Sequence, residues 1–558
     1  MKNTTFTKRI GSYAIVPSVI ILGLSLIVAK SYAQAPQLVK DINPGINSSS
    51  SGFYTNLNGT LIFTADNGAS GTELWKSDGT TTGTIMVKDI VPGPGSSFPS
   101  NLTTVGTLVF FTTNDGINGV ELWKTDGTDA GTELVKDINA GNGSSSPVFL
   151  AGANGVLYFA ADDGDHGSEL WRSDGTDAGT TLVKDITTGG GNSYPSYLTD
   201  VSGTLYFWAD DGIHGSELWK SDGTNAGTIL VKDINPTTGS DPHGLTNVNG
   251  TLFFSADDGT NGYELWKTNG TNAGTVMIKN INSGTGSSPV KLTVVNGTLF
   301  FVADDGVNGL ELWKSDGTLS GTILVKDLSP GSTGSNPENL VSVNGTLFFS
   351  AFDGSPNYGK ELYKSDGTAS GTVLVKDIYP GVPDSDPSKL TNAGNTLYLR
   401  AYDGVNGAEL WKSDGTDGGT VMVEDIRAGN ASAIPSNLLY INNSLFFSAN
   451  DGTTGDELWM VPNASIGVAD LSIHQEFSIY PNPFGTAALI EYYLPRRSDV
   501  TILISDVTGR VIKEIRKGIE PQGKHFAEIN GEELEAGYYF CSLITDVFVS
   551  TNRMIAVR

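Results

Sequence analysis

The sequence predicts an all-β protein: a β-propeller of about nine four-stranded blades closed by the N-terminal strand, then a small C-terminal β-sandwich. Three observations predict this fold. One pattern recurs nine times at a spacing of about 48 residues, each unit divides into four short apolar runs, and the pattern stops past Pro462. The composition agrees, because 70 glycines and only 17% charged residues favour turns and strands, while 38% hydrophobic residues are enough to build cores.

The first 33 residues have the pattern of a secretory signal peptide. A basic start is followed by an apolar stretch over residues 17–29, which is shorter than the ~20 residues that a membrane span needs. Small residues at the end of the segment place the predicted cleavage after Ala33. A retained membrane anchor is the alternative. No other apolar stretch is long enough to span a membrane, so we expect none in the mature chain.

The repeat is marked by the tripeptide Glu-Leu-Trp, in which Tyr replaces Trp once. Its nine copies begin at Glu73, Glu121, Glu169, Glu217, Glu264, Glu311, Glu361, Glu409 and Glu457. Eight of the nine tryptophans in the chain lie in these copies. So steady a period indicates stacked supersecondary units. The high content of Gly, Thr and Asp excludes helical repeats, and immunoglobulin-like domains would need units about twice as long. An open β-solenoid stays as an alternative.

One unit reads as four strands. Predicted strands in the fifth unit cover residues 245–248, 251–256, 264–267 and 275–278. Asn249-Gly250 is a two-residue hairpin turn, because both residues tolerate positive φ. Apolar residues occur on both faces of the second and fourth strands, which predicts sheets that are covered on both sides.

The two ends of the array predict a ring. The fourth-strand motif Val-Lys-Asp-Ile already occurs at residues 39–42, whereas the last unit stops after Trp459 without a fourth strand. In a ring, residues 37–42 become the outer strand of the last blade, which removes an open sheet edge. The count of nine blades exceeds the usual ~4–8.

Two copies of the repeat, Glu217–Thr224 and Glu311–Thr318, read Glu-Leu-Trp-Lys-Ser-Asp-Gly-Thr. This motif resembles the ELWxxDGT repeat of bacterial surface and secreted proteins, and the resemblance covers roughly residues 37–460 of a predicted propeller domain at residues 34–462. It implies an exported repeat protein. It implies no activity, because the family has no agreed biochemical function.

A second region follows the repeat. Residues 463–471 are expected to be a linker, and residues 472–558 alternate in the manner of strands. The seven expected strands are 477–480, 488–493, 500–505, 511–515, 525–529, 538–544 and 553–557. Seven short strands in fewer than 90 residues suggest a β-sandwich.

This second region carries ordered motifs. They are Tyr480-Pro481-Asn482-Pro483-Phe484, then Asp506-Val507-Thr508-Gly509-Arg510, then Gly537-Tyr538-Tyr539, and finally the basic Arg553 and Arg558. The set resembles the type A C-terminal sorting domain of type IX secretion substrates. The resemblance implies that residues 472–558 engage the type IX secretion machinery of a Bacteroidota-type bacterium, and that a sortase-like peptidase removes them. The protein would then be extracellular or on the cell surface. A generic accessory sandwich is the alternative.

Paired aspartates in four units are the candidate metal ligands. They are Asp162, Asp163, Asp210, Asp211, Asp257, Asp258, Asp304 and Asp305. Calcium prefers such oxygen ligands, although Asp-Gly is also an ordinary turn pair and no EF-hand spacing is present. His166 and His214 occupy equivalent positions in neighbouring loops, either as a metal pair or as variable loop residues. We expect no cofactor other than calcium.

The remaining observations exclude whole classes of function. The formal net charge of −27 repels nucleic acid and anionic membranes, and the single cysteine, Cys541, excludes an internal disulfide. No catalytic motif stands out. Because Glu recurs in every blade and Trp in eight of the nine, we expect them to be structural. The leading interpretation is a non-enzymatic binding or adhesion scaffold for a glycan or a protein. The alternatives are a calcium-dependent adhesin and a polysaccharide-acting enzyme with its site on one ring face.

Overall fold

The computed structural model describes residues 35–355, 358–464, 477–494, 497–506, 510–521, 523–545 and 549–557. These residues form strands and turns, with one short 3-10 helix, η2 (Gly531–Glu533), among them. Several predicted features lie outside the described residues: the signal peptide with its cleavage at Ala33, most of the linker 463–471, Val507-Thr508-Gly509 and Arg558.

In the described part of the repeat region, the strands form nine four-stranded antiparallel sheets. The innermost strands are β2 (Gly52–Leu57), β6 (Ser100–Val105), β10 (Val148–Ala153), β14 (Ser196–Val201), β18 (His243–Val248), β22 (Val290–Val295), β26 (Glu338–Val343), β30 (Ser388–Ala393) and β34 (Ser436–Ile441). The second strands are β3 (Thr60–Asp66), β7 (Leu108–Asn114), β11 (Val156–Asp162), β15 (Thr204–Asp210), β19 (Thr251–Asp257), β23 (Thr298–Asp304), β27 (Thr346–Ala351), β31 (Thr396–Tyr402) and β35 (Ser444–Asn450).

The outer half of each sheet carries the repeated motifs. The third strands, which hold Glu-Leu-Trp, are β4 (Thr72–Ser77), β8 (Val120–Thr125), β12 (Ser168–Ser173), β16 (Ser216–Ser221), β20 (Tyr263–Thr268), β24 (Leu310–Ser315), β28 (Glu361–Ser365), β32 (Ala408–Ser413) and β36 (Asp456–Val461). The outermost strands are β5 (Ile85–Lys88), β9 (Glu133–Lys136), β13 (Thr181–Lys184), β17 (Ile229–Lys232), β21 (Val276–Lys279), β25 (Ile323–Lys326), β29 (Val373–Lys376), β33 (Val421–Glu424) and β1 (Gln37–Lys40).

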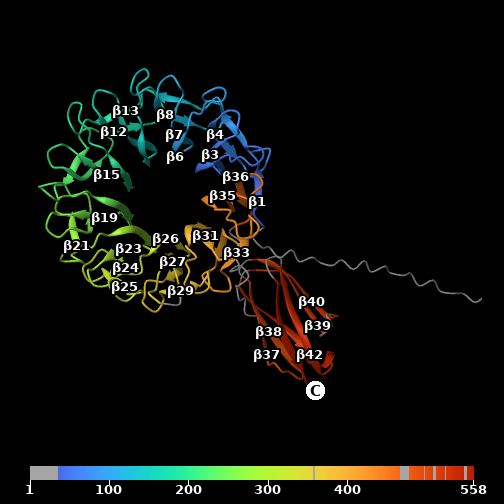
Figure 1. The fold of residues 1–558 in the computed structure, drawn as a ribbon. Helices are drawn as coiled ribbons and strands as arrows, with labels where there is room; N and C mark the ends of the chain where they lie inside the picture. Colours follow the sequence, from blue (N-terminus) through green and yellow to red (C-terminus); the bar gives the residue numbers. More distant parts are fainter. Residues whose placement is uncertain are drawn as a thin grey trace, which may run out of the picture.

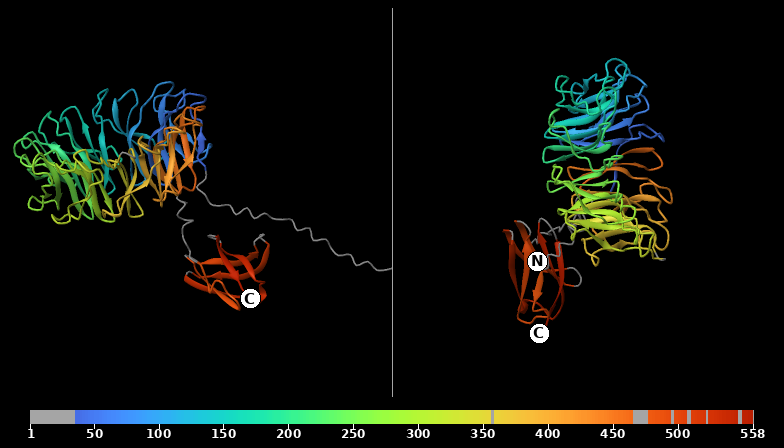
Figure 2. Two further views of the ribbon diagram at one scale, coloured as in Figure 1. Left: turned by 60° about the horizontal axis from the view of Figure 1, so that its bottom comes forward. Right: turned by 90° about the vertical axis from the view of Figure 1, so that its left-hand side faces the viewer.

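The sheets are the blades of a propeller and stand around a central opening (Figure 1). We number them in chain order, from blade 1 (β2 to β5) to blade 8 (β30 to β33). Blade 9 combines both ends of the repeat region, because β1 pairs antiparallel with β36 and places Leu38 opposite Trp459. The pairing predicted for residues 37–42 is therefore present. The innermost strands of successive blades contact one another, and β34 of blade 9 contacts β2 of blade 1. Figure 2 shows the same ring from two further sides.

Aromatic and aliphatic side chains fill the space between blades. Trp219 on β16 is buried against Leu170, Val183 and Ile186 of the preceding blade, and the same arrangement recurs around the ring. The tryptophan of the repeat is thus a wedge between sheets, as its recurrence predicts. Burial of so large a side chain is worth several kcal/mol per blade.

Every innermost strand contains a bulge near its start, where the pairing with the second strand shifts register. The second residue of each innermost strand has a left-handed backbone, with φ between 52° and 66°. These nine bulge residues are Phe53, Asn101, Phe149, Tyr197, Gly244, Lys291, Asn339, Lys389 and Asn437. The bulge also explains one difference from the prediction. Strand β18 begins at His243, two residues earlier than expected, because the strand runs through Gly244, where the apolar pattern is interrupted.

The described C-terminal residues form the predicted β-sandwich of seven strands. One sheet contains β37 (Ser478–Tyr480), β38 (Ala487–Leu494) and β41 (Gly523–Asn530). The other contains β40 (Val511–Glu520), β39 (Ser498–Asp506), β42 (Gly537–Thr545) and β43 (Val549–Ala556). Its core includes Ile490, Ile502, Cys541 and Leu543, which are fully buried. Cys541 is therefore an apolar core residue, and burial raises the pKa of its thiol to about 12.

Candidate functional site

The repeated glutamate joins each blade to the connection that follows. Glu73 is fully buried, and its carboxylate accepts hydrogen bonds from the main-chain amides of Ile90 (3.0 Å) and Ser97 (2.8 Å) and from the Ser97 hydroxyl (2.6 Å). Main-chain amides also donate to Glu121, Glu169, Glu217, Glu264, Glu311, Glu361, Glu409 and Glu457. Burial raises the pKa of these carboxyl groups, to about 7 in Glu169. Their oxygens are occupied by the fold, which leaves little for a ligand.

The basic residue after the tryptophan connects neighbouring blades. Lys76 Nζ donates to the main-chain oxygen of Gly127 in the next blade (2.8 Å), and Lys124 donates to Gly175 in the same way (2.7 Å). Arg172, Lys220, Lys267 and Lys364 make the equivalent contacts. These repeated cations serve packing between blades.

The eight aspartates predicted as calcium ligands lie in four separate loops, at the turn between second and third strands. The first aspartate of each pair accepts a hydrogen bond from the glycine amide two residues later, as in Asp162 with Gly164 (2.7 Å); Asp210, Asp257 and Asp304 do the same. The second aspartate accepts bonds from the residue three positions later, as in Asp163 with His166 (2.9 Å); Asp211, Asp258 and Asp305 follow this pattern. Each carboxylate is thus used by its own turn.

The structure does not bring His166 and His214 together with a shared partner. His166 Nδ1 lies 2.8 Å from Asp163 Oδ2, and His214 Nδ1 lies 2.7 Å from Asp211 Oδ2. Asn118 makes the same contact with Asp115 through its side-chain amide. The histidines therefore act as variable loop residues that replace asparagine. Within the described ranges, no group of three or more His, Cys, Asp or Glu side chains is arranged to hold a metal ion.

The innermost strands differ from this regular background, because their exposed residues change from blade to blade. The bulge position carries aromatic residues in blades 1, 3 and 4, glycine in blade 5, lysine in blades 6 and 8, and asparagine in the other three. The left-handed backbone is unfavourable for a bulky side chain, so the aromatic and lysine residues carry strain there. Strained positions whose side chains vary are candidates for a functional surface.

Two neighbouring hollows lie along this wall. The first has a volume of about 550 Å³ and is lined by residues of β2, β6 and β10, among them Phe53, Asn101, Thr103 and Phe149. Phe53 and Phe149 are each about half exposed, at 53% and 52%. The hollow therefore presents two aromatic faces with an amide and a hydroxyl between them.

The second hollow adjoins the first through Phe149, which lines both. It has a volume of about 450 Å³, and its other lining residues are Tyr194, Ser196, Tyr197, Trp208, Asp241 and His243. Trp208 lies on β15, at a position that is Thr, Ala, Ser, Val or Arg in the other blades. His243 Nδ1 faces the main-chain oxygen of Asp241 (3.0 Å), which makes Nδ1 the donor and leaves Nε2 as an acceptor.

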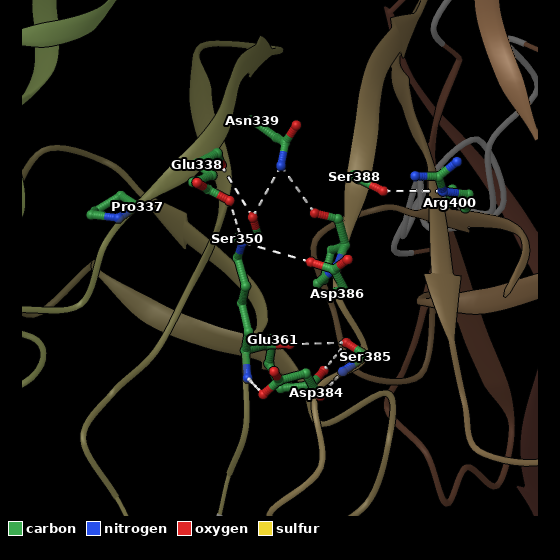
Figure 3. A network of polar contacts seen from close by, with 12 residues as sticks. Pro337, Glu338, Asn339, Ser350, Glu361, Asp384, Ser385, Asp386, Ser388 and Arg400 are labelled. Atoms are coloured by element: carbon green, nitrogen blue, oxygen red, sulfur yellow. Dashed lines mark hydrogen bonds and ion pairs between the residues drawn. The ribbon is translucent and has the colours of Figure 1, made fainter.

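A charged cluster lies beside the innermost strands of blades 6 to 8 (Figure 3), with Glu338 on β26, Lys360 just before β28 and Asp386 just before β30. Lys360 donates to Glu338 and lies 3.6 Å from Asp386, while Lys291 also approaches Glu338, at 3.5 Å. The hydrogen bond from Lys360 holds the pKa of Glu338 below its ordinary value. Arg400 donates to Ser388 (3.2 Å), and Figure 3 shows both on the side of the cluster away from Glu338. The charges of Lys291, Glu338, Lys360 and Asp386 are thus paired with one another.

Sequence reasoning missed the wall of the opening. A signal was present, because eight tryptophans belong to the repeated motif and the ninth, Trp208, does not. The bulge residues had no comparable signal. Their equivalence appears only after the strands are aligned through a bulge that interrupts the apolar alternation.

Comparisons with known proteins identify one part of the chain. Residues 478–557 match a family described as the secretion system C-terminal sorting domain. No curated protein matches the chain. Similar solved structures include PorZ, a surface component of the type IX secretion system of Porphyromonas gingivalis, at 13% identity and a TM-score of 0.25, covering 90% of this chain and 80% of that one.

Two further structures complete the comparison. Sqt1 of Saccharomyces cerevisiae is 12% identical with a TM-score of 0.35, covering 77% of this chain and 99% of that one. A puromycin hydrolase is 13% identical with a TM-score of 0.31, and 66% of this chain covers 61% of it, which is less than two thirds of its length. None of these likenesses carries an argument about function.

Among the described residues, no helix has the length and apolarity that crossing a membrane requires. The sandwich of β37 to β43 coincides with the matched residues 478–557. The C-terminal region is therefore a type IX secretion sorting domain, and the chain is a substrate of that secretion system.

Proposed function

We propose that this chain is a non-enzymatic binding scaffold of the extracellular space or cell surface, whose ligand binds on the wall of the central opening. One observation carries the proposal. The residues that recur in every blade are occupied by the fold, whereas exposed residues that change from blade to blade gather on the innermost strands. A ring that repeats its scaffold and varies its inner surface suits recognition.

Export supports an extracellular role for the ring. The sorting domain at residues 478–557 provides the route, with the type IX secretion machinery as partner. The predicted signal peptide over residues 1–33 would supply the first export step. The ring itself would then act outside the cell, on a glycan or a protein that it meets there.

A polysaccharide-acting enzyme is the competing function, and the charged cluster of blades 6 to 8 is where its site would lie. A glycosidase needs one carboxyl group with a raised pKa to act as the acid. Glu338 has a lowered pKa, and both Glu338 and Asp386 are paired with Lys360. This pairing supports a structural role for the cluster and favours binding over catalysis.

The experiment compares the exported protein with a variant whose wall is made uniform. Asparagine at all five strained bulge positions (Phe53→Asn, Phe149→Asn, Tyr197→Asn, Lys291→Asn, Lys389→Asn) copies a residue that blades 2, 7 and 9 already tolerate there. The immobilised proteins are exposed to extracts of extracellular polysaccharide and protein. We expect the wild-type protein to retain a component of these extracts and to leave the mass of that component unchanged. The wall variant should not retain this component.

The matched control carries five changes on outermost strands, at exposed residues that line neither hollow (Ile85→Thr, Ile229→Thr, Val276→Thr, Ile323→Thr, Val373→Thr). This control should retain the same component as the wild type. Equal retention by the wall variant would overturn the proposed site, and a change in mass of the retained component would overturn the non-enzymatic assignment.

A further inference from the structure

We infer that the inner wall of blades 1 to 5 binds an extended neutral glycan, whose sugar rings stack on an arc of aromatic side chains. The inference deepens the proposed function and rests on it. The aromatic arc comprises Phe53, Phe149, Tyr194, Tyr197 and Trp208.

The shape of the arc matches a chain-like ligand. The two hollows share Phe149, and together they run across five successive innermost strands, from β2 to β18. The ligand that fits such a path is long and contacts one blade after another. Aromatic faces occur in blades 1, 3 and 4, so they recur along the path, as the rings of an oligosaccharide do.

The polar groups between the rings match sugar hydroxyls. Asn101 and Thr103 lie between Phe53 and Phe149, and Ser196, Asp241 and His243 lie beside the aromatic residues of blade 4. Asn101 Nδ2 donates to Thr112 Oγ1 (3.1 Å) and the Thr103 hydroxyl donates to the main-chain oxygen of Asn101 (3.0 Å), so these two residues offer acceptors to a ligand. Ser196, Asp241 and His243 add a hydroxyl, a carboxylate and an imidazole nitrogen. Aromatic rings provide apolar faces with a defined geometry, and a few placed polar groups give specificity.

Charge selects among ligands that stack on aromatic rings. The residues that line the two hollows include no lysine or arginine and one carboxylate, Asp241. A single-stranded nucleic acid would need a cationic groove, and an acidic polysaccharide would meet Asp241 and a chain of net charge −27. A neutral glycan has no such penalty.

The backbone indicates that the aromatic side chains are kept for a reason other than folding. Phe53, Phe149 and Tyr197 have φ of 52°, 56° and 55°, a region that is unfavourable for a bulky residue. Gly244, at the equivalent position of blade 5, avoids this cost. The chain can therefore form the bulge without a ring there.

The test measures binding of linear hexasaccharides to the exported protein by isothermal titration calorimetry. The neutral probes are hexamers of β-1,4-glucose, β-1,3-glucose, α-1,4-glucose, β-1,4-mannose and β-1,4-N-acetylglucosamine, and the anionic probe is hexagalacturonate. We expect at least one neutral hexamer to bind and hexagalacturonate not to bind. Trp208→Ser, which copies Ser255 of blade 5, should weaken that binding at least tenfold.

The matched control is Ile213→Thr, which copies Thr260 of blade 5 at a loop tip that is 82% exposed and does not line either hollow. It should bind as the wild type does. A second variant, Tyr197→Gly, copies Gly244 and removes a strained residue, so its melting temperature should be unchanged or higher while binding weakens. This variant keeps the test valid if Trp208→Ser fails to fold.

The failures of the two proposals are distinguishable. If no neutral hexamer binds, or if both Trp208→Ser and Tyr197→Gly bind as the wild type does, the glycan inference is overturned. A wall variant that still loses an extracellular component would then leave the binding scaffold intact with another ligand. A third outcome is that the wild-type protein binds a proline-rich peptide and none of the hexamers, and that Trp208→Ser and Tyr197→Gly weaken this peptide binding. That result would identify a peptide groove and would also overturn the inference.

Discussion

Two tryptophans on neighbouring strands of blade 4 have opposite roles. In the pairing of β15 with β16, Trp208 is opposite Leu218 and Phe207 is opposite Trp219. Trp219 has a counterpart in seven other units and is buried between blades, at 6% exposure. Trp208 has no counterpart and lines a hollow. The comparison teaches that recurrence marks residues that hold the ring together, and that a departure from the repeat can mark a residue that lines the wall of the opening.

Charged residues repeat the same contrast. Every Glu of the repeated motif accepts main-chain hydrogen bonds, and none of them forms an ion pair with a residue in the described part of the chain. The cluster of Lys291 on β22, Glu338 on β26 and Lys360 just before β28 occurs once among the described residues, and its members pair with one another. The buried glutamates are thus the same all around the ring, whereas the side chains of the wall differ: they are mainly aromatic in blades 1 to 4 and charged in blades 6 and 7.

The largest expected effect separates the two tryptophans by stability. Trp219→Ala should lower the free energy of unfolding by about 3–5 kcal/mol, because it leaves a cavity between blades. Trp208→Ser should cost about 1 kcal/mol or less, because six other blades carry Ser, Thr or Ala at that position. Chemical denaturation of both variants measures the difference. Equal losses of unfolding free energy in the two variants would show that Trp208 is as important for packing as Trp219.

The next prediction asks whether β1 is an outermost strand like the others. Val39→Asp places a carboxylate in the packing between blade 9 and blade 1, and Val183→Asp does so at the equivalent position of blade 3; the two valines are 3% and 5% exposed. Each should cost about 3 kcal/mol, since an unpaired charge is buried. A stable Val39→Asp protein beside a destabilised Val183→Asp protein would show that the ring does not depend on β1.

A smaller effect concerns pH and the uniform glutamates. Burial raises the pKa of Glu169, Glu361, Glu409 and Glu457 from 4.5 to about 7. The folded state then binds protons that the unfolded chain releases, so this stabilisation is complete below pH 4.5 and is lost as the pH rises through about 7. The melting temperature should therefore fall between pH 5 and pH 8.

The loop that contains His166 also loses stability as the pH rises. Hydrogen bonding to Asp163 raises the pKa of His166 above its ordinary value, which adds stability that is also lost as the pH rises. Differential scanning fluorimetry across the window measures the sum. A melting temperature that increases from pH 5 to pH 8 would contradict the buried, proton-binding state of the glutamates.

The smallest expected effect is that of calcium. The carboxylates of Asp162 and Asp163 already accept hydrogen bonds from their own turn, and the other three loops do the same. Adding calcium to the chelator-treated protein should therefore shift the melting temperature by less than about 1 °C, since an ion that binds the folded state would raise it. A larger rise would favour the calcium-dependent adhesin.

Much of the scaffold was predictable from the sequence. A strict period, Asn-Gly turns and apolar runs are local properties, so the four strands of a unit and most sandwich strands were predicted within two residues of their observed bounds. The exceptions are β40, which continues to Glu520 and not to residue 515, and β43, which begins at Val549 and not at residue 553. The offset between Val39-Lys40-Asp41-Ile42 and the truncated last unit predicted that β1 pairs beside Trp459. The sorting domain was recognisable because its motifs follow one another in a fixed order.

The candidate site was not predictable, because its residues come from five blades and meet only around the opening. Phe53 and Tyr197 are 144 residues apart in the chain, and Phe149 between them gives no sign of facing the same space. Left-handed bulges decide which side chains line the wall, and a bulge breaks the alternation by which a sequence reveals its exposed face. The amino-acid order alone thus determines the repeated sheets, through turns and burial patterns that act within one unit. Only the tertiary structure decides the binding surface, since it arises from the curvature that brings the innermost strands of different units side by side.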